Sequence, residues 1–322
     1  MRWSGLLVAA ATLGLAACAA HPQPARVAAK PPPATRQCPG CPSPEVVVAE
    51  VARLRAALAA SVPQDDPAIA PDRYPVWIAL AQEAIRVAHV MLLRPQLLVV
   101  VDRNPAVQRL AIVLADPSGP WQVIGGGKVS TGEAGVRGAY ITPTGVFVHD
   151  GGILDYRALG TFNAYHIRGL GIKGMRVWDF GWQTAERGWG PPGETGQIRM
   201  LLHATDPDAL EPLLGKPTSE GCIHVSTAMN RFLDVHGVLD SDYELLARFD
   251  SNYEWVLLPD RDPSILAGDK LVIVDSLAPL TLSRRSHQGR EDGEASPAIC
   301  SPDVPAAASM GKAVCQPPPS AL

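Results

Sequence analysis

The residues from Ser219 to Ser226 carry the clearest combination of side chains for covalent chemistry. They read Ser-Glu-Gly-Cys-Ile-His-Val-Ser, so Cys222 follows a glycine in a polar turn and precedes a short apolar run. Upstream, His203 ends another apolar run, Ile198–Leu202. A thiol is nucleophilic as its thiolate, and histidine is the usual base that takes its proton. The pattern predicts acyl transfer with Cys222 as nucleophile and His203 as base, and the amides of Gly221 and Cys222 would face an oxyanion.

Other interpretations of these residues exist. A cysteine outside a disulfide is more often a small buried apolar residue than a nucleophile. A metal site of His203, Cys222 and His224 is a third possibility, because residues 222 and 224 share one face of an extended strand. No fourth ligand lies at a recognisable spacing, so neither a metal nor another cofactor is expected.

The start of the chain predicts export. Arg2 precedes an apolar run, Leu6–Ala17, which is too short to span a bilayer and is typical of a signal peptide over residues 1–17. The run ends in Leu-Ala-Ala-Cys, which resembles a bacterial lipobox, so Cys18 would carry the lipid. Ala19 is typical of lipoproteins sent to the outer membrane. We therefore expect a periplasmic, lipid-anchored protein; an ordinary signal cut at a nearby alanine is the alternative.

The composition is that of an exported globular protein. The chain has 322 residues, of which 47% are hydrophobic and 19% charged, with a net charge of −4. This length allows one or two domains with a sizeable core. The near-neutral charge argues against a nucleic-acid partner.

The six cysteines divide by place. Without Cys18 and Cys222, two local pairs are left on either side of the main domain: Cys38 with Cys41, and Cys300 with Cys315. In an oxidising compartment each pair would close a loop, or the pairs would bridge each other. The Cys-Pro-Gly-Cys spacing is also that of a redox or zinc motif, but it lies in a proline-rich stretch without a second ligand pair.

Two helices are expected before the main domain. Residues 18–44 are proline-rich and predict an extended tether. Residues 45–95 predict a helical segment that packs on the domain. Its first helix, Glu45–Ala60, has an apolar stripe at 4-3-4 spacing, and its second, Val76–Arg94, is stopped by Pro95. The stripe consists of Val47, Val51, Leu54 and Leu58.

The domain itself, residues 96–276, predicts mainly antiparallel β-structure. Short β-rich runs alternate with proline and glycine turns. The expected strands are Leu97–Val101, Leu110–Leu114, Trp121–Val129, a strand within Thr142–Val148, Ser251–Leu258 and Lys270–Asp275, with a short helix at Thr227–Val235. Residues 151–196 are rich in glycine and aromatic side chains and predict an insertion, which is a lid, a groove wall or a packed Ω-like loop. Residues 277–322 predict a disordered tail.

Several motifs occur in a fixed order: Val129–Gly132, Thr142–Phe147, His203, Ser219–Ile223 and Gly268–Ile273. Together they resemble the L,D-transpeptidase (YkuD-type) catalytic domain over about Leu97–Asp275. The resemblance implies a β-sandwich-like domain with the cysteine in a cleft. It also implies peptidoglycan stem peptides as partners: the thiolate attacks the carbonyl between diaminopimelate and D-alanine, D-alanine leaves, and the thioester passes to an amine or to water.

The resemblance also implies residue roles. His203 would activate Cys222 and then protonate the leaving amine, and the carbonyl of Ala204 would orient its ring. The amides of Gly221 and Cys222 would hold the oxyanion, and Ser219 would shape the turn.

Two positions depart from the family pattern. Glu220 stands where the family has histidine; its carboxylate would disfavour the thiolate, favour a protonated histidine, or bind the amine of the substrate. His224 stands where the family has arginine or asparagine, positions that often contact substrate carboxylate. Arg199 and Arg176 are then the nearest candidates for carboxylate binding, with simple surface solvation as the other reading.

Two rival functions are compatible with the sequence. The same dyad would serve a hydrolase that cuts stems with water instead of joining them. Alternatively, the chain is a non-catalytic wall-binding lipoprotein in which the motif has decayed.

Overall fold

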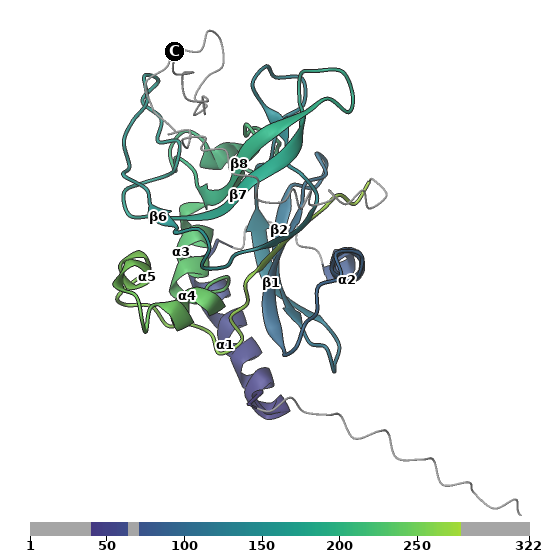
Figure 1. Cartoon of the computed structure of the whole chain (residues 1–322), viewed down its shortest axis with the longest axis vertical. Coiled ribbons are helices and arrows are strands. Elements are labelled where there is room, and N and C mark those ends of the chain that lie inside the picture. The colour runs from purple at the N-terminus through teal and green to yellow at the C-terminus, as the bar shows by residue number, and fades with distance from the viewer. Residues whose placement is uncertain (1–39, 64–70, 278–322) are drawn as a thin grey trace, which may run out of the picture. The chain divides into compact units, whose positions relative to one another are not determined.

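The computed structural model describes residues 40–63 and 71–277. The predicted signal peptide, most of the tether and the tail fall outside the described residues, as do Cys18, Cys38, Cys300 and Cys315. The described chain folds into two five-stranded sheets with five α-helices around them (Figure 1), which confirms the expectation of a mainly β fold.

The first sheet has the strand order β3-β2-β1-β10-β5. Its strands are β1 (Gln96–Asp102), β2 (Arg109–Ala115), β3 (Gln122–Lys128), β5 (Gly145–Val148) and β10 (Lys270–Val274). All five were expected from the sequence. The antiparallel pairing expected from the turns between residues 97 and 129 is confirmed for β1, β2 and β3, and β1 also pairs in parallel with β10.

The second sheet has the order β4-β7-β8-β9, with β6 also paired to β7. Its strands are β4 (Tyr140–Ile141), β6 (Tyr156–Arg157), β7 (Arg176–Arg187), β8 (Thr195–Ala204) and β9 (Ile223–Val225). β7 pairs with β8 from Val177 opposite His203 to Glu186 opposite Thr195. Residues 176–187, expected within an insertion, therefore form a central strand.

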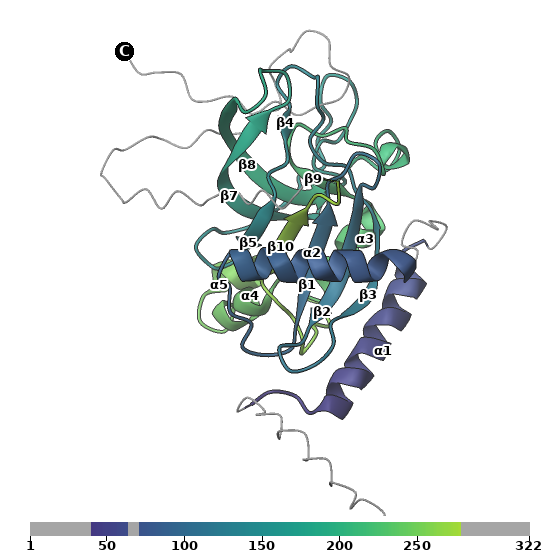
Figure 2. The ribbon, with the colours of Figure 1, turned by 90° about the vertical axis from the view of Figure 1, so that its right-hand side faces the viewer.

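The main core lies between the two sheets. Alternate residues of β1, such as Leu97 and Val99, point into it together with Met200 and Leu202 of β8. The other face of the first sheet, with Leu98 and Val100, packs against α2 (Tyr74–Val87). Figure 2 shows this helix crossing the strands of the first sheet. The first sheet is thus buried on both faces.

The helices follow their sequence signals in part. α1 (Pro44–Ser61) buries its predicted stripe in the main core, and Ser43 caps its N-terminus. α2 ends at Val87, well before Pro95, and His89 then takes a positive φ of 53°. α3 (Thr227–Val235) is as expected, with Ser226 as its cap.

One predicted strand is wrong. Ser251–Leu258 holds α5 (Ser251–Val256), which follows α4 (Ser241–Leu246). The Asp250 side chain accepts a hydrogen bond from the Asn252 amide and so starts the helix, a cap signal that outweighs the aromatic composition. Two short 3₁₀ turns, Pro71–Arg73 and Glu211–Leu213, complete the elements. Within the described residues, no helix combines the length and apolar character that a membrane crossing requires.

Candidate active site

Strands β8 and β9 bring the two predicted catalytic segments side by side. They pair in parallel, with Leu202 opposite Ile223 and His203 opposite His224. On its other side β9 is fixed by Ser130, whose amide donates to the His224 carbonyl at 3.0 Å and whose carbonyl accepts from the His224 amide at 2.9 Å. The short β9 is therefore held from both edges.

Cys222 and His203 share the outer face of the second sheet. Leu202 points into the core between the sheets, so its neighbour His203 points the other way. Cys222 packs against a small cluster that contains Val177 and Leu201. Val177 pairs with His203 across the sheet, and Leu201 is two residues from it along the strand. The fold thus places the thiol and the imidazole on one surface.

The ring of His203 is fixed in one tautomer. Its Nδ1–H donates to the Ala204 carbonyl at 2.7 Å, the contact that the sequence analysis expected. Nε2 is then the nitrogen that can accept a proton. The side chain is 2% exposed, and this burial lowers the pKa of His203 to about 4, against the smaller opposing effect of the Ala204 hydrogen bond. The imidazole is therefore a neutral base at ordinary pH.

Cys222 is half-buried and stands outside any disulfide, whereas Cys41 is disulfide-bonded. How Cys41 pairs among Cys38, Cys300 and Cys315 is still a prediction. The Cys222 thiol donates to the Arg199 carbonyl at a Sγ···O distance of 3.7 Å. A neutral thiol can donate to a carbonyl oxygen and a thiolate cannot, so this contact suits the protonated form.

Ser219 closes the turn before the cysteine. Its hydroxyl donates to the Cys222 carbonyl at 2.6 Å and accepts from the Gly221 amide at 3.1 Å. The prediction that the Gly221 amide faces an oxyanion is therefore wrong for this conformation. Gly221 has a φ of +132°, and an added Cβ would lie 2.9 Å from Ile198 Cδ1, so the turn requires glycine.

Thr142 braces the same turn, a role that the sequence analysis did not assign. The fully buried hydroxyl donates to the Gly221 carbonyl at 2.9 Å and accepts from the Gly132 amide at 2.8 Å. The Tyr140 amide donates to the Glu220 carbonyl at 3.0 Å. Thr142 begins the Thr-Pro-x-Gly motif, and that motif was the only sequence signal for this contact.

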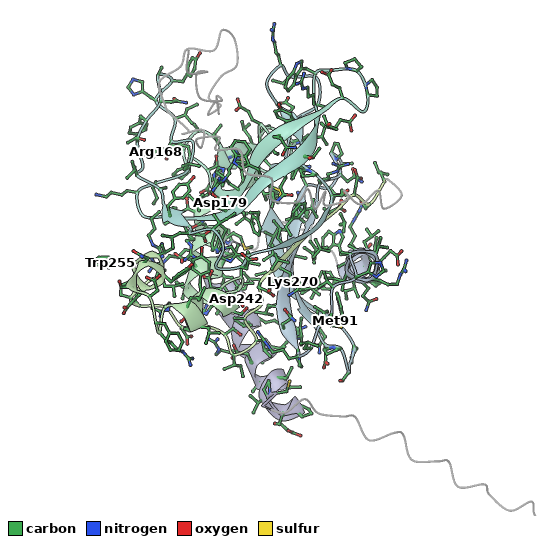
Figure 3. All side chains as sticks on the ribbon, viewed as in Figure 1. Met91, Arg168, Asp179, Asp242, Trp255 and Lys270 are labelled. Carbon is green, nitrogen blue, oxygen red and sulfur yellow. The ribbon has the colours of Figure 1, made fainter. Side chains whose placement is uncertain are left out.

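Three of the four expected substrate contacts lie at this face: Glu220, Arg199 and His224, whose ring neighbours that of His203. Glu220 is half-buried in the cysteine turn, and Arg199 precedes Leu201 on β8. Asp179 of β7 (Figure 3) holds the Arg199 guanidinium at 2.8 Å through Nη2, and the Trp182 ring lies 5.9 Å from it. The Arg199 side chain is 28% exposed, so it is oriented by a buried carboxylate yet still reaches solvent.

Arg176 corrects the sequence analysis. Its side chain is fully buried, with Nη2 2.9 Å from Asp155 and 3.1 Å from Asp240. Burial alone would lower its pKa, but Asp240 and Asp155 outweigh it and the pKa is raised. A guanidinium enclosed in this way cannot bind a substrate carboxylate or be solvated at the surface.

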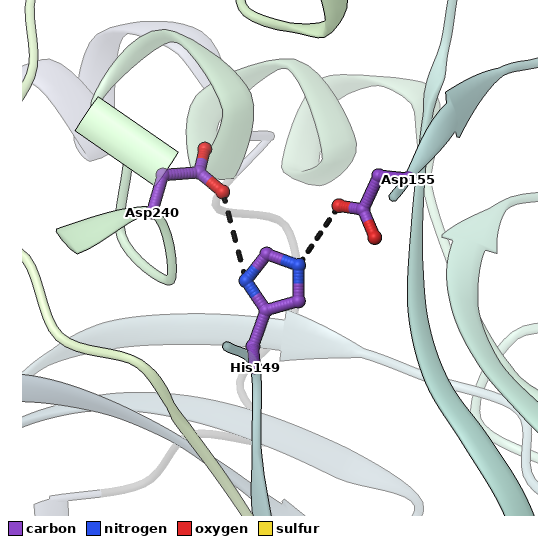
Figure 4. A group of neighbouring side chains, drawn as sticks. All are labelled: His149, Asp155 and Asp240. Atoms are coloured by element: carbon purple, nitrogen blue, oxygen red, sulfur yellow. Dashed lines mark hydrogen bonds and ion pairs between the residues drawn. The ribbon is translucent and has the colours of Figure 1, made fainter. Parts of the chain in front are cut away.

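His149 completes this buried cluster (Figure 4). Its Nε2 lies 2.9 Å from Asp155 Oδ2, and its Nδ1 lies 2.9 Å from the Leu239 carbonyl and 3.8 Å from Asp240. Both ring nitrogens face acceptors, an arrangement that suits a doubly protonated ring. Burial opposes this charge, but Asp155 and Asp240 outweigh burial and raise the pKa of His149.

The cluster also bears on metal binding. Among the described residues, one trio has ligand atoms within 4.8 Å of one another, and it is His149, Asp155 and Asp240. The Arg176 guanidinium already occupies the position between the two carboxylates. His203, Cys222 and His224 do not form such a group.

The segment before β7 covers part of the outer face. Ala158, Leu170, Ile172 and Met175 belong to the cluster against which Cys222 packs. A Cβ on Gly171 would lie 2.8 Å from the Ala204 Cβ, so the chain passes very close to the strand that carries His203. Residues 158–175 thus border the candidate site.

Comparison with known proteins gives little direct guidance. No protein-family profile matches the chain, and no curated protein does. Among solved structures, Bdellovibrio bacteriovorus Bd1075 aligns with a TM-score of 0.26 and 16% identity, over 56% of this chain and 48% of its own. A fused Zn-dependent amidase/peptidase/peptidoglycan-binding domain-containing protein of Clostridium acetobutylicum aligns with a TM-score of 0.23 and 16% identity, over 66% of each chain. The chain therefore spans about half of the first protein and about two thirds of the second.

Proposed function

We propose that this chain is a cysteine acyltransferase of the L,D-transpeptidase type that acts on peptidoglycan stem peptides. The observation that carries the proposal is the placement of Cys222 and His203 on one sheet face, with the His203 Nδ1–H held by the Ala204 carbonyl. This contact leaves the other ring nitrogen as a proton acceptor. Reactive cysteines require such a base.

The reaction would start from a neutral pair. Burial keeps His203 unprotonated, and the thiol is protonated, so the proton moves as the sulfur attacks the donor carbonyl. The Cys222 sulfur forms the thioester and the terminal amine leaves. An acceptor amine then attacks the thioester and frees the thiol. Gly221 contributes to the oxyanion only if its amide leaves Ser219.

Substrate recognition would use the charged groups of this face. Arg199 presents an oriented guanidinium and Glu220 a carboxylate in the cysteine turn, which suit a stem peptide that carries both carboxylates and an amine. His224 lies next to His203 and belongs to the same surface. Export and anchoring through Cys18 would place the site at the cell wall.

Product analysis of the purified enzyme tests this function. Incubation with tetrapeptide muropeptides and mass spectrometry of the products should show cross-linked dimers and released D-alanine. Tripeptides without dimers would instead assign the hydrolase. If the folded protein leaves the muropeptides unchanged, the result would favour a non-catalytic wall-binding protein.

A further inference from the structure

A second imidazole lies beside the proposed base. The rings of His203 and His224 have their centroids 4.6 Å apart at an interplanar angle of 53°. The two residues are paired in register across β8 and β9, so their side chains share one face. The two backbone hydrogen bonds between His224 and Ser130 hold the backbone of His224 in place.

Protonation of one of two rings this close opposes protonation of the other. Two unit charges 4.6 Å apart disfavour double protonation by about fivefold to about four-hundredfold, for an effective dielectric between 80 and 20. His203 is 2% exposed, whereas His224 is half-buried and better solvated. Desolvation opposes charge, so of the two rings His224 accepts a proton more readily and His203 stays the neutral base.

The surrounding ionisable groups are mixed in sign. On the segments paired with β9 they are His203 and Arg199 of β8 and Lys128 and Glu133 on either side of the Ser130 bridge, with Glu220 and Cys222 in the turn before β9. Glu211 lies further along, on Thr227 at the start of α3. No single neighbouring charge dominates, so the partial exposure of His224 and its pairing with His203 distinguish it from the other ionisable groups.

We propose that His224 is a second catalytic residue, the general acid that protonates the departing amine while His203 takes the proton of Cys222. This inference rests on the acyl transfer proposed above. It separates two tasks that a single histidine would otherwise perform in turn.

The proton balance closes over one cycle. In acylation the Cys222 sulfur bonds to the donor carbonyl carbon, its proton passes to His203 Nε2, and the carbon–nitrogen bond breaks as the amine takes the proton of His224. The acyl-enzyme then has a protonated His203 and a neutral His224. In transfer the acceptor amine bonds to the carbonyl carbon and gives its proton to His224. The carbon–sulfur bond breaks, and the sulfur regains its proton from His203.

Leaving-group dependence tests this division. Two donors would be compared: a stem tetrapeptide, whose leaving amine needs a proton, and the matching tripeptide 4-nitrophenyl ester, whose leaving phenolate needs none. Both give the same thioester on Cys222. The variants are His224→Asn, His203→Asn and the control His89→Asn. His89 is an exposed histidine just after α2, and asparagine tolerates its positive φ.

The expected result is a selective loss. His224→Asn should acylate with the tetrapeptide about 10²- to 10⁴-fold more slowly and with the ester by a far smaller factor, whereas His203→Asn loses both. His89→Asn should match the wild type. In the wild type, tetrapeptide acylation should decline toward high pH as His224 loses its proton, and ester acylation should not.

Equal losses of His224→Asn on both donors, or no loss on either, would overturn the inference. If His224→Asn does not fold, the two wild-type pH profiles decide, and identical profiles refute the assignment. A wild type that acylates with neither donor would instead refute the proposed function, so the two failures are distinguishable.

Discussion

Thr142 offers a sharp test of how the cysteine turn is held. Thr142→Val keeps the shape of the side chain but removes the hydroxyl, which leaves the Gly132 amide and the Gly221 carbonyl without this partner. Each buried group that loses its partner costs about 1–3 kcal/mol, so the variant should lose about 2–6 kcal/mol of unfolding free energy. Thr142→Ser keeps both hydrogen bonds and loses one methyl group, at about 1 kcal/mol.

Urea unfolding of the two variants measures this difference, and the rate of Cys222 alkylation by iodoacetamide reports the position of the turn. We expect Thr142→Val to be less stable than Thr142→Ser and to show an altered alkylation rate. Equal stability of the two variants would show that the hydroxyl does not brace Gly221.

Three further outcomes follow from the same structure. Gly221→Ala should destabilise the turn and abolish acylation, because φ is +132° and the added Cβ meets Ile198. Wild-type stability in urea unfolding together with wild-type acylation would contradict this. The raised pKa of His149 means that its ion pairs stabilise the fold fully below the unfolded value of about 6.5 and lose that contribution as pH rises through the folded value, so His149→Gln should remove this slope in unfolding measured against pH. The lowered pKa of His203, about 4, gives the opposite pH dependence. The wild type should lose about 3 kcal/mol of unfolding free energy as pH falls from about 6.5 to below 4, and His203→Asn should not show this loss.

The parts of the fold that the sequence predicted are those with strong periodicity. The α1 stripe, the strands of the first sheet and the capped helix α3 depend on local patterns of apolar residues, and these patterns match the observed burial. The segment 251–258 shows the limit of this reasoning. Its aromatic residues favour a strand, but Asp250 caps the backbone and most of the side chains face solvent, so a helix forms.

The sequence predicted those residues of the candidate site whose type and motif spacing indicate chemistry. It did not predict the contacts between segments that are distant in the sequence. Cys222 and His203 were identified from residue type and motif. The bracing by Thr142, the pairing of His203 with His224 and the burial of Arg176 depend on strand register and on segments distant in sequence. Residues 176–187 were assigned to an insertion because the glycine- and aromatic-rich composition of residues 151–196 hides the alternation of a strand that is buried over half its length.

The most direct test of the central claim is intact-protein mass spectrometry after incubation with a stem tetrapeptide. The account predicts a thioester-linked tripeptide on the wild type that hydroxylamine releases, none on Cys222→Ala, and acylation at least about a hundredfold slower on a folded His203→Asn variant. A wild type that never gains the adduct, or an adduct that persists in Cys222→Ala, would contradict it.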